Sequence, residues 1–128
     1  MIATLPYIEE KYRAFNKEVF GGELPAVRLE LSRARSFLGA LVSKRRRTWL
    51  FGPIEHYDYR LRISTRFDLP ETTLEDILLH EMIHYYIAVK NIRDTSAHGH
   101  AFRDLMKQIN REYGRHISIT YRVPRPIE

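Results

Sequence analysis

Two kinds of hydrophobic spacing divide this sequence into helical and extended segments. Over Thr4–Phe20 apolar side chains recur every three or four residues, which predicts a helix that ends at the Gly21-Gly22 pair. Apolar and polar residues then alternate over Ala26–Ser32 and again over Tyr59–Ser64, which predicts two half-buried strands. The first half of the chain is therefore expected to be one helix followed by a sheet.

The stretch between these two strands indicates a hairpin. The continuous apolar run at Phe37–Val42 is typical of a more buried strand, and Thr48–Phe51 is interpreted as the returning strand, stopped by Gly52-Pro53. The basic run Lys44–Arg47 then falls at the tip of the hairpin.

Helical spacing returns in the second half of the chain. A helix is predicted over about Thr73–Lys90, with Thr72 as its N-cap and Glu75 completing a capping box. A second helical pattern ends at Gly114, and alternation over Ile117–Val123 predicts a final short strand.

This order of elements favours the α+β class, with a small, mostly antiparallel sheet packed on about three helices. With 128 residues, the chain is expected to form a single domain over residues 1–128. No apolar run approaches the roughly 20 residues of a membrane span. Because Met1–Glu10 also lacks the basic and apolar regions of a secretory signal, we expect no membrane partner and a cytoplasmic location, including association with the nucleoid.

The amino-acid composition limits which side chains can bind a metal or act as a nucleophile. The chain has no cysteine, which excludes a disulfide scaffold, a thiol nucleophile, an iron–sulfur cluster and a zinc ribbon, so any metal must be held by His, Asp or Glu. Lys and Arg total 21 against 16 Asp and Glu, a net charge of +5 that favours a polyanionic partner, nucleic acid first.

The strongest chemical signal is the sequence His80-Glu81-Met82-Ile83-His84 in the middle of the second predicted helix. Residues four apart lie on one helix face, so the two imidazoles can bind the same metal ion. Glu81 is placed to take a proton from a water on that metal, which is the zinc hydrolase pattern. The simpler alternative, two hydrogen-bonded core histidines beside a surface glutamate, leaves three polar groups of an apolar helix unexplained.

A catalytic zinc site needs a third protein ligand and an open position for water. The metzincin spacing is excluded because Ile87 and Lys90 occupy the positions where that class has Gly and His. We favour His98, which is expected to open the next helix, and then His100. The other candidates are Asp94, Asp104, Glu112 and His116.

Several separated motifs, spread over about Tyr7–Asn110, resemble the SprT-like zinc metalloprotease family. They are His80–His84, the later His98-Gly99-His100-Ala101-Phe102, and the earlier Phe20-Gly21-Gly22-Glu23-Leu24-Pro25 and Leu38-Gly39. The resemblance implies a compact zincin-like domain with HExxH on the middle helix and the metal between two helices. It also implies that His80, His84 and His98 bind one Zn²⁺ ion and that Glu81 is the catalytic base.

The same resemblance implies an endopeptidase whose substrates are DNA-associated or DNA-crosslinked proteins. Many relatives carry a C-terminal zinc ribbon, which these residues do not contain, so DNA targeting is expected to come from the domain itself. Two other functions stay open. One is a DNA-binding or adaptor module with a non-catalytic zinc site, and the other is a zinc hydrolase acting on a non-protein amide. A fourth ligand at His100 would close the site and favour the DNA-binding or adaptor module.

A basic and aromatic cluster is the candidate nucleic-acid site: Lys44, Arg45, Arg46, Arg47 and Trp49, with Phe51 after it and Arg33 and Arg35 before it. Basic side chains and a stacking aromatic suit DNA, single strands above all. A solvated hairpin tip, where charges block edge pairing, explains the cluster equally well.

Three further interpretations concern the surroundings of the metal. Asp76, four residues before His80, is a candidate to orient that imidazole, or else a first-turn acid. Tyr85, Tyr86 and Tyr121 are candidate donors to the transition state, although such tyrosines more often belong to the core. The strand Tyr59–Ser64, if it is an edge, can accept a substrate as an added strand.

Overall fold

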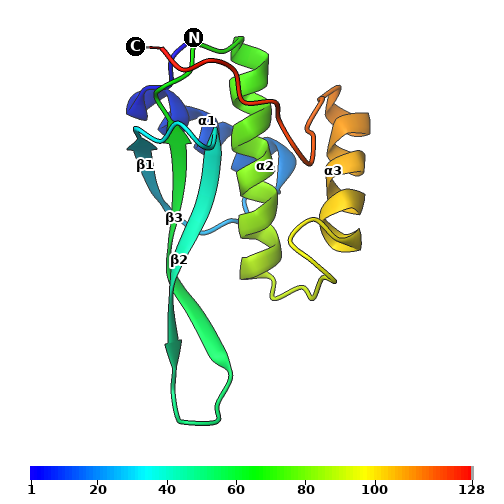
Figure 1. Cartoon of the computed structure of the whole chain (residues 1–128). Coiled ribbons are helices and arrows are strands. Elements are labelled where there is room, and N and C mark those ends of the chain that lie inside the picture. Colours follow the sequence, from blue (N-terminus) through cyan, green and yellow to red (C-terminus); the bar gives the residue numbers. More distant parts are fainter. Residues whose placement is uncertain (128) are drawn as a thin grey trace.

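The computed structural model describes residues 1–127 (Figure 1). It contains three helices and three strands, which confirms the predicted α+β class. In chain order these are α1 (Leu5–Val19), β1 (Arg28–Ser32), β2 (Gly39–Arg47), β3 (Ile54–Ser64), α2 (Glu71–Val89) and α3 (His100–Tyr113). None of these helices combines the length and the apolar character that a membrane crossing requires.

The three strands form one mixed sheet in the order β1-β3-β2. β3 runs parallel to β1 and antiparallel to β2, and the antiparallel pairing spans more residues. Because β3 lies in the centre, Tyr59–Ser64 is a paired strand and does not offer the free edge to which a substrate strand could add. The free edges belong to β1 and β2, and β2 is the one that contacts α2.

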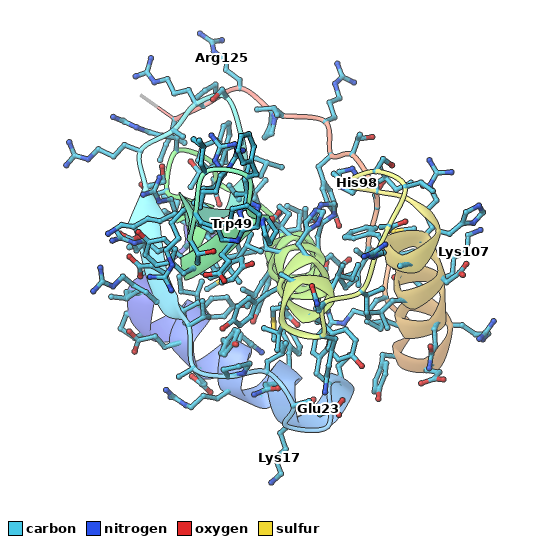
Figure 2. The ribbon with its side chains drawn as sticks, turned by 90° about the horizontal axis from the view of Figure 1, so that it is seen from below. Lys17, Glu23, Trp49, His98, Lys107 and Arg125 are labelled. Atoms are coloured by element: carbon cyan, nitrogen blue, oxygen red, sulfur yellow. The ribbon has the colours of Figure 1, made fainter. Side chains whose placement is uncertain are left out.

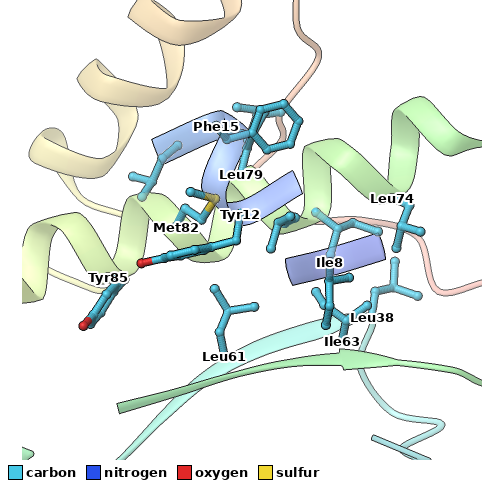
Figure 3. Close-up of a cluster of buried hydrophobic side chains, with 14 of the residues drawn as sticks. Ile8, Tyr12, Phe15, Leu38, Leu61, Ile63, Leu74, Leu79, Met82 and Tyr85 are labelled. Carbon is cyan, nitrogen blue, oxygen red and sulfur yellow. The ribbon is translucent and has the colours of Figure 1, made fainter. Parts of the chain in front are cut away.

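Helix α2 is the centre of the hydrophobic core. It contacts α1, α3, β2 and β3, and a helix enclosed on most sides is expected to be apolar around most of its circumference. Leu79 and Met82 of α2, Tyr12 of α1 and Leu61 of β3 belong to one cluster of buried side chains (Figure 3). The HExxH motif His80–His84 therefore sits on the most enclosed element of the fold.

The start of α2 differs from the sequence prediction. The helix begins at Glu71 with Pro70 as its N-cap, and no side chain caps it. Thr72 already lies inside the helix, and the Glu75 carboxylate instead accepts a hydrogen bond from Arg115 at 2.7 Å. The capping box is therefore wrong, because a long-range ion pair uses the glutamate that the motif would need.

The hairpin is longer than the sequence predicted. Lys44–Arg47 lies within β2, and Arg47 pairs with Ile54, so the predicted return strand Thr48–Phe51 is in fact the turn. The cross-strand pairs of the basic run with β3 extend the sheet as far as Arg47. We call residues 44–58 the hairpin arm, which projects from the body of the domain (Figure 1).

The last described segment, residues 115–127, crosses α2 without regular secondary structure, and we call it the strap (Figure 1). The predicted strand Ile117–Val123 is wrong because side chains and not a neighbouring strand satisfy this backbone. Asn110 of α3 donates to the Ile117 carbonyl at 2.9 Å and accepts from the Ile117 amide at 2.8 Å. Arg115 binds Glu75 and also Asp76, so both α2 and α3 hold the strap.

We predict that Asn110→Ala lowers the free energy of unfolding by about 1–3 kcal/mol, because it leaves both backbone groups of buried Ile117 without a partner. Urea denaturation followed by circular dichroism measures this change. Lys107→Ala, at an exposed position on the same helix, is the control and should change stability by less than about 0.5 kcal/mol. Equal denaturation midpoints for the two variants would contradict the strap assignment.

Candidate metal centre

Three imidazoles converge on one point between α2 and the loop that precedes α3. His80 and His84 project from one face of α2, and His98 comes from the loop, two residues before α3 begins (Figure 2). The Nε2 atom of His98 lies 3.2 Å from Nε2 of His84 and 3.2 Å from Nε2 of His80. His98 therefore does not open the helix, as the sequence predicted, but reaches the cluster from the loop.

The spacing of the three nitrogens fits a single tetrahedral ion. With Zn–N distances of about 2.0–2.1 Å, two ligands of a tetrahedron are separated by about 3.3–3.4 Å. The observed separations of 3.2 Å are close to this value. Within the described part of the chain, these three residues form the one group of His, Asp or Glu side chains that could hold a metal.

The orientation of His80 is fixed from the far side of its ring. Its Nδ1 donates to the backbone carbonyl of Ser118 in the strap at 2.7 Å, which leaves the lone pair of Nε2 directed at the cluster. Burial lowers the pKa of His80, an effect that the Ser118 carbonyl partly opposes. The neutral imidazole that a metal requires is thus favoured at neutral pH.

Phe102 of α3 forms an apolar wall behind all three imidazoles. Its ring centroid lies 4.9 Å from that of His80, 4.6 Å from that of His84 and 4.8 Å from that of His98, and the side chain is fully buried. Burial, followed by the neighbouring imidazoles, lowers the pKa of His84 to about 4. In the sequence Phe102 belongs to the second helical pattern and to the His98–Phe102 motif, and this packing gives it a physical role.

Glu81 is a buried carboxylate at the edge of the cluster. Its Oε2 lies 3.9 Å from Nε2 of His80, and only 6% of the residue is exposed. Burial raises its pKa to about 7, while a hydrogen bond from the backbone of Leu41 in β2 acts in the opposite direction. A carboxylate with this pKa can accept or release a proton near neutral pH.

The approach of β2 to this carboxylate depends on Gly39. A Cβ atom at this position would lie 2.9 Å from Cγ2 of Ile77 and 3.3 Å from Cγ of Glu81. The strand and the cluster together line a cleft of about 470 Å³, whose walls are Gly39, Ala40, Leu41, His80, Glu81, His84, Ala97 and His98.

The loop that carries His98 is shaped by Asp94. The Asp94 carboxylate accepts hydrogen bonds from the amides of Thr95 at 2.9 Å and Phe102 at 3.0 Å, and so caps the start of α3. A Cβ at Gly99 would lie 2.1 Å from Oδ1 of Asp94, so this turn requires glycine. Arg103 donates from Nε to the carbonyl of His98 at 2.9 Å. Asp94 therefore acts on the loop and is not one of the converging ligands.

The other sequence candidates lie apart from the cluster. His100 is exposed at the first position of α3 and borders a separate hollow with Thr95 and Arg103. Asp104, Glu112 and His116 are exposed and also lie outside the group. Asp76 does not orient His80, because the Ser118 carbonyl occupies that role and Asp76 binds Arg115.

Of the three tyrosines considered, Tyr121 lies beside the cluster. Its ring centroid is 5.8 Å from that of His80, and burial raises its pKa to about 12, so the phenol keeps its proton. Tyr85 instead packs on Tyr59, and Tyr86 packs on Phe20.

The basic cluster of the sequence is divided by the fold. Lys44, Arg45, Arg46 and Arg47 are exposed in the hairpin arm, and Trp49 is exposed in its turn. Arg33 and Arg35 lie in the β1–β2 connection, which the register places at the Ser64 end of β3, opposite the arm. Within the arm, Lys44 pairs with Asp58 and Arg46 with Glu55, each at 3.3 Å, so acidic partners offset part of the positive charge.

The fold and the cluster define an α+β domain with an HExxH helix and a third histidine supplied by the following loop. The chain belongs to the SprT-like family, whose model matches residues 8–122. The protein is 32% identical over 120 residues to the DNA-dependent metalloprotease SPRTN of Bos taurus and 30% identical over 120 residues to that of Homo sapiens.

These alignments cover 93% of this chain but 23% of each relative. The SPRTN of Danio rerio is 32% identical over 115 residues, which are 89% of this chain and 17% of that protein. The chain thus spans about a quarter or less of the length of the curated relatives it matches.

We predict that zinc affinity falls between pH 7 and pH 5.5 by much less than a site of three ordinary imidazoles would lose. A lowered imidazole pKa keeps the neutral, metal-binding form populated to lower pH, and burial lowers the pKa of all three histidines. Three imidazoles with the ordinary pKa near 6.5 would lose roughly 500-fold over this range. Competition with a fluorescent chelator measures both affinities. His98→Ala should weaken binding at both pH values, whereas a wild-type loss of several hundredfold would contradict the assigned environment.

Proposed function

We propose that residues 1–128 form one SprT-like metalloprotease domain, a zinc-dependent endopeptidase that acts on DNA-associated or DNA-crosslinked proteins. The observation that carries this proposal is the convergence of three Nε2 atoms beside a buried carboxylate, at the wall of an open cleft. Family membership and the name of the SPRTN relatives support the same chemistry.

In this proposal His80, His84 and His98 hold one zinc ion, and each residue has a defined task. The zinc would supply a Lewis acid that lowers the pKa of a water and polarises the peptide carbonyl. The Glu81 carboxylate accepts the proton of the attacking water and later donates it to the leaving amine. A pKa of about 7 allows this one group to do both.

A fourth protein ligand would favour the non-catalytic alternative, because structural zinc sites are usually closed by four ligands. His100 was the candidate for that position. It is exposed on α3 and lies outside the converging group, so the arrangement supports a site with a free position. The protease is therefore the function that the geometry supports best.

Strand β2 offers the place where a substrate backbone can align. It is an edge strand, and its residues Gly39, Ala40 and Leu41 border the cleft beside Glu81. Main-chain hydrogen bonds to an edge strand bind extended peptides with little dependence on sequence. A substrate strand would therefore add to the first residues of β2 and not to Tyr59–Ser64.

DNA association is proposed for the hairpin arm. The arm carries Lys44, Arg45, Arg46, Arg47 and the exposed Trp49, and the protein has a net charge of +5. The arm and the loop that carries His98 project from the same end of the molecule (Figures 1 and 2). A single-stranded DNA bound by the arm would therefore hold an attached protein near the cleft.

We predict that Glu81→Gln lowers the cleavage rate of a DNA-binding protein by at least about a hundredfold, because the amide cannot accept the proton of the attacking water. Zinc affinity should remain within about threefold of wild type, since Glu81 is not a ligand in this proposal. Gel-based cleavage and chelator competition measure the two quantities. Glu112→Gln, on the exposed surface of α3, is the control. Normal cleavage by Glu81→Gln would exclude its role as base.

We predict that replacing Lys44, Arg45, Arg46 and Arg47 by Ser weakens binding to single-stranded DNA and reduces its salt dependence. Each lost phosphate contact should lower the log–log salt slope by about 0.7. Fluorescence anisotropy at several salt concentrations measures the slope. Arg33→Ser/Arg35→Ser, at the opposite end of the sheet, should change it less. An unchanged slope in the arm variant would remove the arm from DNA binding.

A further inference from the structure

A second hollow lies next to the cleft and is not used by the chemistry described above. It has a volume of about 230 Å³ and is enclosed by the β1–β2 connection, by α2 and by the strap. We call it the strap cavity. Its lining includes Leu38, Gly39, Ile77, Ile119, Tyr121 and Val123.

The strap cavity and the cleft are neighbours. Gly39, His80 and Glu81 border both spaces, so the two hollows adjoin at the candidate proton acceptor. Gly39 carries no side chain, which keeps this junction free, since even a Cβ would approach Ile77 within 2.9 Å. A peptide lying along β2 would therefore have one side chain directly beside the strap cavity.

The walls of the strap cavity suit an uncharged, apolar group. Their apolar members are Leu38 and Ile77, which are buried, and Ile119 and Val123 of the strap. Tyr121 contributes a phenol whose hydroxyl accepts the amide hydrogen of Ser118 at 3.0 Å. Glu81 at the junction is the one carboxylate among the lining residues. An anionic side chain would lose its hydration there and would meet the Glu81 carboxylate without gaining an opposite charge.

The size of the cavity is consistent with a large side chain. Its 230 Å³ holds several water molecules, each of which takes about 30 Å³ in the liquid. Transferring a Leu, Met or Phe side chain into such a space releases that water and buries apolar surface on both partners. Small or charged side chains gain much less.

We propose that the strap cavity is the specificity subsite of this domain and that it binds an aromatic or long aliphatic side chain of the substrate next to the cleaved bond. This inference rests on the proposed protease function. The strap thus contributes twice to the site: Ser118 orients His80, and Ile119 and Val123 select the substrate side chain.

The test consists of two experiments, one that measures cleavage and one that measures binding. In the first, the zinc-loaded protein cleaves a set of peptides that differ at one position on either side of the scissile bond. We expect kcat/KM to be about tenfold to a hundredfold higher for Phe, Leu or Met than for Gly or Asp on one fixed side. A flat profile overturns the proposal.

Val123→Arg places a cation at the wall of the cavity and should reduce the apolar preference at least about tenfold. Val123 is 42% exposed, and Ile92→Arg, at a residue that is 41% exposed away from the cavity, is the matched control. The control should keep the wild-type preference. A Val123→Arg profile equal to that of wild type overturns the proposal.

The binding experiment does not depend on protease activity. N-acetyl-phenylalanine amide and N-acetyl-aspartate amide are titrated into the protein with methyl-labelled Ile and Val. The first should shift the methyl resonances of Ile77, Ile119 and Val123, and the second should not. If wild type cleaves no peptide but these shifts occur, the protease function fails and the apolar site stands. If they do not occur, the subsite is excluded whatever the peptides show.

Discussion

The structure depends on the burial of polar groups in its most apolar helix. α2 carries the buried imidazole of His80, the half-buried imidazole of His84 and the buried carboxylate of Glu81, and such groups are costly to bury without partners. The surroundings supply those partners: the Ser118 carbonyl for His80, the Leu41 backbone for Glu81, and the Phe102 ring as a wall for the imidazoles. Burial also shifts the pKa values in the directions that metal binding and proton transfer require, so the same packing that stabilises the fold prepares the chemistry.

The strap shows how one irregular segment can link stability to the site. Asn110 and Arg115 hold it against α3 and α2, and this attachment places the Ser118 carbonyl against His80. Because side chains bond the strap backbone at Ile117 and Ser118, the path of this part of the strap is set by those contacts and not by a sheet. The segment also walls the cavity beside Glu81. Orientation of a proposed ligand and selection of a substrate side chain would then depend on the same few anchoring bonds.

Strand β2 connects the proposed chemistry to the proposed DNA contact. Its first residues border the cleft, and its last residues form the basic part of the hairpin arm. The antiparallel pairing with β3 makes this a continuous element, so a polyanion on the arm and a peptide at Gly39 would be held by one strand. Ion pairs with Asp58 and Glu55 offset part of the arm's charge, and the turn of the arm exposes Trp49 and Phe51.

The sequence by itself determined the α+β class, the three helices, and the convergence of His80, His84 and His98, because helical spacing and the distinctive HExxH and HGxxF motifs are local signals. Only the tertiary structure decided the rest. The Glu75 carboxylate binds Arg115 and does not complete the predicted capping box. Lys44–Arg47 lies in a paired strand, and Ile117–Val123 belongs to the strap. These outcomes depend on partners tens of residues away in the sequence, and the carbonyl that orients His80 belongs to the backbone, which carries no residue-specific pattern.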